Sequence, residues 1–170
     1  SVPGTNLEPA WSPDGKQLAY VSRRAGEDLA GAIAIYSVVT RELRELPPLK
    51  LFYAQGLSWA PDGRSLAFVG PDLKGRCGIF RIDVNTGAVS PIAYPIPLTF
   101  QTPHWSADGR RLYFNTVRDG FYEWDTTLGR LRRISPGPVP FRNLGPISMS
   151  PDGRWIASYA RPMKELQSVM

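Results

Sequence analysis

The sequence predicts an all-β fold, a β-propeller of about three and a half blades, each made of four antiparallel strands. Two observations predict it: one tight-turn motif recurs four times, and short β-rich runs flank each copy. The copies are residues 11–16, 59–64, 105–110 and 149–154. Their aspartates lie 48, 46 and 44 residues apart, which matches one propeller blade and exceeds the ankyrin, tetratricopeptide and leucine-rich periods.

Each repeat reads as strand, tight turn, strand. Proline fixes φ in the turn in three copies, aspartate follows, and glycine accepts a positive φ. Second strands are expected at 18–21, 66–69, 112–114 and 156–159, and third strands at 33–36, 79–83 and 121–125. Turns at 85–87 and 127–129 lead into short fourth strands, and no helical periodicity lies between them.

We expect one partial propeller over residues 1–170, with the first strand of each blade innermost. The expected blades are about 7–47, 55–93 and 101–135, with a partial fourth over about 144–170. An open arc exposes a sheet face at each end, which favours association. Either a longer parent protein supplies the missing blades, or two copies complete each other. We favour the first, because the sequence also lacks an initial Met and so resembles an excised piece.

The repeats resemble a known family. The Trp-Ser-Pro-Asp-Gly core, the following Leu-Ala-Tyr/Phe, the later Ile-Tyr/Phe and Thr-Gly, and the loop at 22–26 are similar to the WD40-like (PD40) repeat of TolB-type propellers. They are also similar to the propellers of prolyl-oligopeptidase-type serine peptidases. The resemblance implies a non-catalytic scaffold that binds protein or peptide, in the periplasm or cell envelope if TolB-like. The alternatives are a substrate-gating propeller of such a peptidase, or the sensor or partner-binding domain of a bacterial regulator or kinase.

Composition excludes several other classes. The chain is 42% hydrophobic and 21% charged, as soluble globular domains are, and it has no apolar run long enough for a membrane span. Its net charge of +5 suggests nucleic acid, but the basic residues are scattered and no nucleic-acid motif accompanies them. Cys77 is the only cysteine, which excludes an internal disulfide and a thiolate metal cluster.

The repeated residues have structural interpretations. Large side chains at equivalent innermost positions are expected to pack between blades. The turn aspartates are expected to cap their turns, because no Asp-x-Asp-x-Asp-Gly calcium loop occurs. We therefore predict no metal and no cofactor. The structural residues are Trp11, Asp14, Gly15, Trp59, Asp62, Gly63, Trp105, Asp108, Gly109, Met149, Asp152 and Gly153.

No motif for catalysis is present. The sequence has no Gly-x-Ser-x-Gly elbow, no His-Glu-x-x-His and no phosphate-binding glycine loop. His104 is the only histidine, where the other repeats have Ala10, Ser58 and Ser148. It is placed to line the central channel, but a single histidine with no evident nucleophile is a poor basis for catalysis. We therefore predict no catalytic residue in this chain.

Partner binding is expected at the connections between blades, residues 47–53, 94–100 and 135–142, which mix proline with large apolar groups. Loops on a rigid scaffold commonly carry binding, and aromatic and arginine side chains commonly anchor interfaces. The alternative is that the aromatic side chains tuck inward and cap the end of the channel. The candidate residues, with His104, are Phe52, Tyr53, Tyr94, Phe100, Phe141 and Arg142.

Overall fold

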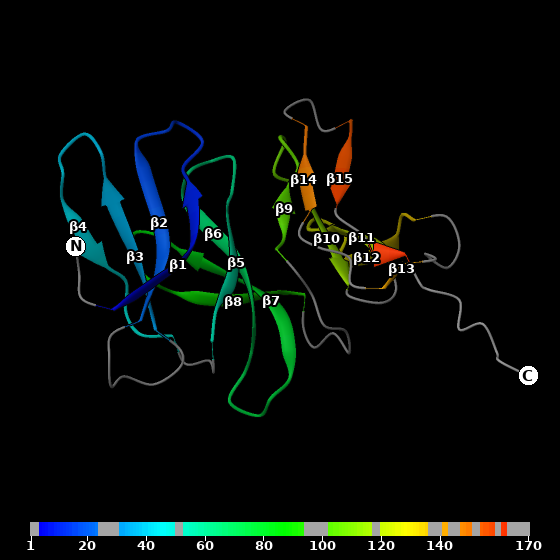
Figure 1. The fold of residues 1–170 in the computed structure, drawn as a ribbon, viewed down its shortest axis with the longest axis horizontal. Helices are drawn as coiled ribbons and strands as arrows, with labels where there is room; N and C mark the ends of the chain where they lie inside the picture. The colour runs from blue at the N-terminus through cyan, green and yellow to red at the C-terminus, as the bar shows by residue number, and fades with distance from the viewer. Residues whose placement is uncertain are drawn as a thin grey trace, which may run out of the picture.

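The structure is a computed structural model, and every regular element it describes is a β-strand (Figure 1). It describes residues 4–23, 31–49, 53–93, 102–116, 120–135, 147–150 and 154–158, and the backbone of 141–142 and 161–162.

Three four-stranded antiparallel sheets follow one another along the chain, each with its strands in sequence order. Blade 1 contains β1 (Thr5–Trp11), β2 (Gln17–Arg23), β3 (Ala32–Ser37) and β4 (Leu43–Glu45). Blade 2 contains β5 (Gln55–Trp59), β6 (Ser65–Pro71), β7 (Cys77–Asp83) and β8 (Val89–Ala93). Blade 3 contains β9 (His104–Trp105), β10 (Arg111–Thr116), β11 (Gly120–Asp125) and β12 (Arg130–Arg133). The predicted all-β, four-stranded architecture is confirmed.

A fourth unit is smaller in the described residues. Strands β14 (Ile147–Met149) and β15 (Ile156–Ser158) form a hairpin, here called blade 4. Two very short strands, β13 (Phe141–Arg142) and β16 (Arg161–Pro162), pair with each other. The prediction that Phe141 and Arg142 belong to a connecting loop was therefore wrong for their backbone, which forms ladder hydrogen bonds in place of a loop.

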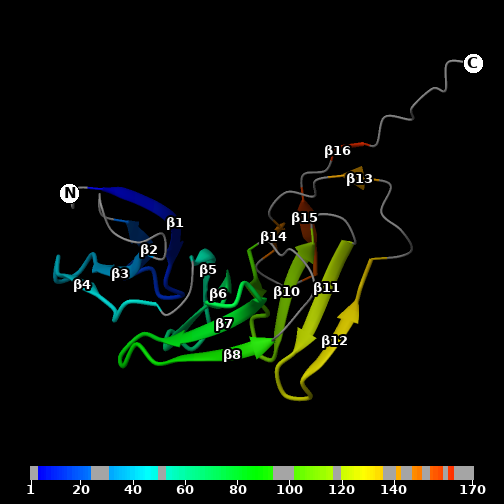
Figure 2. The same ribbon diagram turned by 90° about the horizontal axis from the view of Figure 1, so that it is seen from below.

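The first strands of successive blades are neighbours: β1 contacts β5, β5 contacts β9, and β9 contacts β14. They lie toward the middle of the molecule in Figure 1, while Figure 2 shows β4 and β12 on the outside. The sheets form an open arc, as predicted for an incomplete propeller.

The turn motif closes through its own polar side chains. In blade 1 the Ser12 hydroxyl donates to Asp14 Oδ1 at 2.7 Å, and the Lys16 N–H donates to the same oxygen at 3.0 Å. The same bonds recur in blade 3, from the Ser106 hydroxyl at 2.6 Å and the Arg110 N–H at 3.0 Å to Asp108 Oδ1. The serine hydroxyl is the main cause that lowers the pKa of each aspartate.

Apolar side chains seal the joints between blades. Because side chains alternate across a strand, each sheet presents one face to the preceding blade and the other to the next. The face of blade 1 toward blade 2 carries Ala19, Val21, Ile33 and Ile35, all at most 2% exposed. Blade 2 covers them with large groups in one cluster, which include Trp59, Leu66, Phe68, Phe80 and Ile82. Burying each such large side chain contributes about 1.5–3 kcal/mol, so this joint is a hydrophobic core.

The joint between blades 2 and 3 repeats the arrangement. Ala67, Val69 and Ile79 of blade 2 meet Leu112 and Phe114 of blade 3. Trp105, Tyr122 and Trp124 pack at the edge of this cluster. One rule thus holds at both joints: small or β-branched residues face large or aromatic residues of the next blade.

Candidate functional site

The predicted partner-binding residues fall mostly outside the part of the chain that the structure describes. Phe52, Tyr94 and Phe100 lie outside the described residues, and Phe141 and Arg142 have only their backbone described. Tyr53 is half-buried, just before the innermost strand of blade 2. Partner binding at these connections therefore remains a prediction.

His104 lies at the joint between blades 3 and 4. Its ring hydrogen-bonds the backbone of Ile147 in β14, and burial is the main cause that lowers its pKa. Its Nε2 atom is buried and has no hydrogen-bond partner among the described residues. The ring is thus held neutral between two blades, with no described hydroxyl, thiol or carboxylate bound to Nε2 that would make it a general base.

The three repeat tryptophans differ in burial. Trp59 is 7% exposed, and its indole N–H donates to the Ala10 carbonyl of blade 1 at 3.0 Å. Trp105 is half-buried against blade 2. Trp11 is 58% exposed, which departs from the predicted packing role, because no described strand covers that side of blade 1.

The uncovered face of blade 1 contains a pocket of 680 Å³. It is mainly apolar and carries two tyrosines. Its lining residues are Asn6, Leu7, Pro9, Leu18, Tyr20, Tyr36 and Leu43. Leu18 and Tyr20 occupy the positions that Leu66 and Phe68 occupy in blade 2, where the preceding blade buries them. This face thus has the composition of an interface.

Glu8 is a residue that the sequence analysis did not single out. It lies at a β-bulge in β1 with a positive φ of 56°, a conformation that costs a side-chain-bearing residue about 1–2 kcal/mol. The equivalent position in blade 2 is Gly56, at φ 65°. The Glu8 carboxylate accepts the Gly56 N–H at 2.9 Å and so links the two innermost strands. The sequence did hold a signal for Glu8: it lies three residues before the repeat tryptophan, at the place where blade 2 has a glycine.

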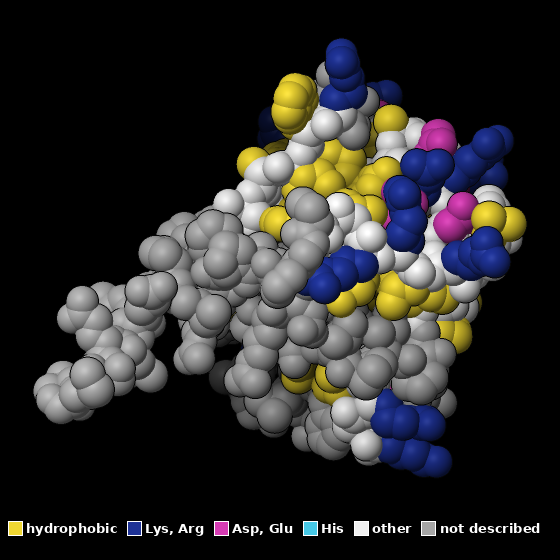
Figure 3. All heavy atoms as spheres, turned by 90° about the vertical axis from the view of Figure 1, so that its right-hand side faces the viewer, with side chains coloured by type: hydrophobic (Ala, Val, Ile, Leu, Met, Phe, Trp, Pro, Cys, Tyr) yellow, Lys and Arg dark blue, Asp and Glu magenta, His cyan; other side chains and the backbone are white. Residues whose placement is uncertain are grey.

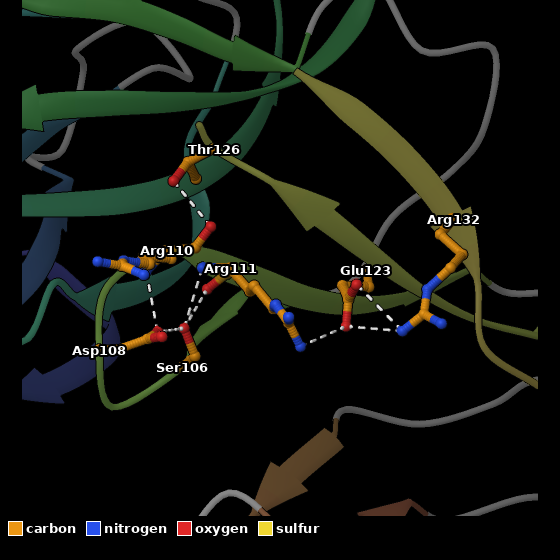
Figure 4. A network of polar contacts seen from close by, with 7 residues as sticks. All are labelled: Ser106, Asp108, Arg110, Arg111, Glu123, Thr126 and Arg132. Atoms are coloured by element: carbon orange, nitrogen blue, oxygen red, sulfur yellow. Dashed lines mark hydrogen bonds and ion pairs between the residues drawn. The ribbon is translucent and has the colours of Figure 1, made fainter. Parts of the chain in front are cut away.

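A second missed feature is a polar network on the face of blade 3 that points away from blade 2 (Figure 4). The Arg132 Nη2 atom lies 3.2 Å from the Glu123 carboxylate, and Arg111 Nη1 lies 3.5 Å from it. Strand pairing places Glu123 directly opposite Arg132, so both side chains share this face. The signal was the alternation along 111–115, 121–125 and 130–133, which puts Glu123 where blade 1 has Ile35 and blade 2 has Arg81.

Basic side chains are prominent on this side of the molecule. In Figure 3, which views the right-hand side of Figure 1, Lys and Arg groups surround an apolar area and a few acidic groups. Arg110, Arg111, Arg130 and Arg132 are all exposed residues of blade 3. In the described part of the chain, no group of three or more His, Cys, Asp or Glu residues is arranged to hold a metal ion. The same residues include no helix that could cross a membrane.

These features agree with the comparison against known families. The model of the TolB β-propeller domain, PD40, matches residues 1–170. The chain belongs to the TolB β-propeller (PD40) family. The resemblance inferred from the repeat motifs is thereby confirmed.

Two curated relatives of this PD40 chain are named as peptidases. Dipeptidyl-peptidase 5 of Porphyromonas gingivalis is 24% identical over 140 residues, 75% of this chain and 20% of the relative. The uncharacterized peptidase YuxL of Bacillus subtilis is 39% identical over 71 residues, 39% of this chain and 10% of the relative. The chain therefore spans no more than about a fifth of the length of either protein.

Solved structures show the same fold. TolB from Acinetobacter baumannii has a TM-score of 0.77 and 25% identity, covering 94% of this PD40 chain and 38% of that chain. A putative TolB from Agrobacterium tumefaciens has a TM-score of 0.66 and 18% identity, covering 89% of this chain and 63% of that chain.

Proposed function

We propose that this PD40 chain is a recognition module that binds a protein or peptide and contributes no catalytic group of its own. The observation that carries the proposal is the way its polar residues are used. Asp14 and Asp108 accept the hydrogen bonds that close the turns, and the only histidine of the chain bonds a backbone group of the next blade. The described surface carries exposed aromatic, apolar and basic groups, such as Trp11 and Arg110, and these suit binding.

The predicted site for this partner is the set of connections between blades. Their aromatic residues and Arg142 combine large contact area with hydrogen-bonding capacity, as interface anchors do. The likeness to TolB structures supports the scaffold, and loops on a rigid scaffold commonly carry binding residues.

The test is a five-residue variant of the intact protein in which Phe52, Tyr53, Phe100 and Phe141 become serine and Arg142 becomes glutamine. A displayed peptide library is selected against the original protein, and the selected peptides are then measured against both proteins. We expect the variant to lose binding while its circular dichroism spectrum and thermal midpoint stay unchanged. A control with exposed Val38, Val39 and Leu73 changed to serine should keep binding. Full binding by the five-residue variant would refute this site.

A second candidate function is the substrate-gating propeller of a serine peptidase. The observation that favours it is that both curated relatives carry peptidase names. In that case the nucleophile belongs to another part of the protein, and this chain selects which peptides reach it.

A fluorophosphonate probe separates the two candidates, because it labels an activated serine covalently. Labelling of the intact protein, together with release of dipeptides from an unblocked peptide, supports the peptidase. Absence of labelling under conditions that label a known serine peptidase supports the non-catalytic binding protein.

A further inference from the structure

The first two joints between blades share one steric pattern. On the face toward the next blade, the residue just before the repeat tryptophan lies directly opposite a residue of the second strand. In blade 1 this pair is Ala10 and Ala19, and in blade 2 it is Ser58 and Ala67. The next blade brings its own repeat tryptophan into the cluster that holds each pair. A small pair on one blade thus leaves room for a large ring from the next.

The joint between blades 3 and 4 departs from this pattern on both of its sides. Blade 3 carries His104 opposite Tyr113, two large side chains at the positions of the small pair. Blade 4 carries Met149 at the position of the repeat tryptophan. Blade 4 itself has a small pair again, because Ser148 lies opposite Ala157. The exchange is therefore confined to this joint: where the receiving pair is large, the incoming side chain is narrower.

The hydrogen bond across the joint changes sides together with the exchange. At the first joint, the indole N–H of Trp59 in the following blade donates to the Ala10 carbonyl of the preceding blade at 3.0 Å. Methionine has no N–H in its side chain and cannot make this bond. His104, at the position of Ala10, bonds the backbone of Ile147 in the following blade with its ring instead. Strands β9 and β14, which carry these two residues, lie side by side (Figure 1).

The residues of this joint are packed together. Ile147 is buried, and His104, Tyr113 and Met149 are half-buried. Because side chains alternate along a strand, Met149 shares with Ile147 the face of β14 toward blade 3. Methionine is unbranched and flexible, so it fits the irregular space beside two rings. A rigid indole at this position would compete with His104 and Tyr113 for the same space.

We propose that His104 and Tyr113 make blade 3 selective for its neighbour: they accept a blade with methionine at the repeat position and exclude a blade with tryptophan there. The repeats are alike, and misassembly between similar units is a characteristic failure of repeat proteins. Exchange of blades between two copies would bring a tryptophan-bearing blade to this face. A steric mismatch against the wrong neighbour is a common source of specificity. The only histidine of the chain thus has a role in the order of the blades, separate from the proposed recognition function.

The experiment is a double-mutant cycle on the intact protein, measured by urea unfolding. Met149→Trp should raise the equilibrium constant for unfolding by about tenfold to a hundredfold, because the joint becomes overpacked. His104→Ser with Tyr113→Ala restores the small pair and should raise the same constant by about tenfold or more, because Met149 leaves the space unfilled. The variant with all three changes places tryptophan against a small pair. Its unfolding constant should be at least about tenfold smaller than the two separate effects multiplied together.

Met149→Leu is the matched control for the change at the repeat position. Leucine keeps the volume and the apolar character of methionine, so this variant should raise the unfolding constant less than Met149→Trp does. It should also show no favourable coupling to the small pair, because leucine does not fill the space that His104 and Tyr113 vacate. An equal coupling for leucine and tryptophan would overturn the proposal, since the pair would then not discriminate by size.

The remaining outcomes are also decisive. If Met149→Trp alone does not fold, the predicted result is that the variant with all three changes recovers a cooperative unfolding transition. Strictly additive effects, or a tryptophan tolerated beside His104 and Tyr113, would refute the selectivity. The proposed recognition function does not depend on this result, because the five-residue variant of the connections tests it separately.

Discussion

The face of blade 1 toward blade 2 and the face of blade 3 that points away from blade 2 use the same backbone with different side chains. In both, the second, third and fourth strands of one blade present alternate residues on the face toward the next blade. In blade 1 these residues include Val21, Ile33 and Ile35, and the next blade buries them. In blade 3 the equivalent surface carries Glu123 between two exposed arginines.

The difference shows that a repeat fixes the turns and the strand order but leaves each face open to change. The turn bonds of Ser12 and Asp14 recur atom for atom in Ser106 and Asp108. The residues on the faces decide instead whether a blade seals against its neighbour or offers polar groups. The recognition function proposed for this chain belongs to the connections between blades.

The largest expected effect comes from the tryptophan that seals the first joint. Trp59→Ala should lower the free energy of unfolding by about 3–5 kcal/mol, because it removes a buried ring and leaves a cavity. Trp11→Ala, at the same place in a blade with an uncovered face, should cost about 1 kcal/mol or less. Urea unfolding of both variants measures the difference. Equal losses would mean that the face of Trp11 is as well covered as that of Trp59.

A glycine pair sharpens the comparison at the backbone. Gly56 has a positive φ, and an added Cβ would lie 2.6 Å from the Thr102 Cα of blade 3. Gly56→Ala should therefore cost about 3 kcal/mol, from both strain and overpacking.

Gly63→Ala is the matched control for Gly56→Ala. Gly63 has nearly the same φ, but nothing lies within 4 Å of its added Cβ, so only the backbone strain of about 1–2 kcal/mol applies. Thermal unfolding distinguishes the variants. A Gly56→Ala cost no greater than that of Gly63→Ala would show that the innermost strands of blades 2 and 3 are less closely packed.

The smallest expected effect is the pH dependence of His104. Burial lowers its pKa below the ordinary value of 6.5, so the folded protein takes up a proton less readily than the unfolded chain. The stability that His104 contributes is complete above that ordinary value and decreases as the pH falls from it toward the lowered folded pKa. Replacement by serine, the residue at the equivalent positions Ser58 and Ser148, should remove this component.

The measurement is unfolding by urea at about pH 8 and about pH 5.5, on either side of the unfolded histidine pKa. Asp14 and Asp108 do not confuse it, because their pKa values are lowered from 3.8 and their stabilisation is lost only in more acidic solution. An unchanged pH dependence in His104→Ser would place the proton uptake elsewhere.

The fold could be predicted from the sequence because its signals are local and repeated. The turn chemistry of the Pro-Asp-Gly motif and the alternation beyond it need no knowledge of distant contacts, so four-stranded sheets were expected and found. The uses of individual residues depend on neighbours far along the chain. Trp11 and Trp59 look alike in sequence, yet only the second has a blade against it. Glu8 and Glu123 were missed because their partners, Gly56 and the two arginines, are assigned by packing and strand register.

The central claim is that equivalent faces of blades 1 and 3 are stabilised differently, the first by apolar packing and the second by a buried acid between two arginines, and a reciprocal exchange tests it most directly. Ile35→Glu places an unpaired carboxylate in the sealed joint and should cost about 3–5 kcal/mol of unfolding free energy. Glu123→Ile removes the acid but leaves two arginines that are 49% and 67% exposed and therefore stay hydrated, so it should change stability by about 1 kcal/mol or less. Urea unfolding of the two variants against the original protein gives both values. A large loss for Ile35→Glu with little change for Glu123→Ile is the predicted result, and equal losses would contradict the account.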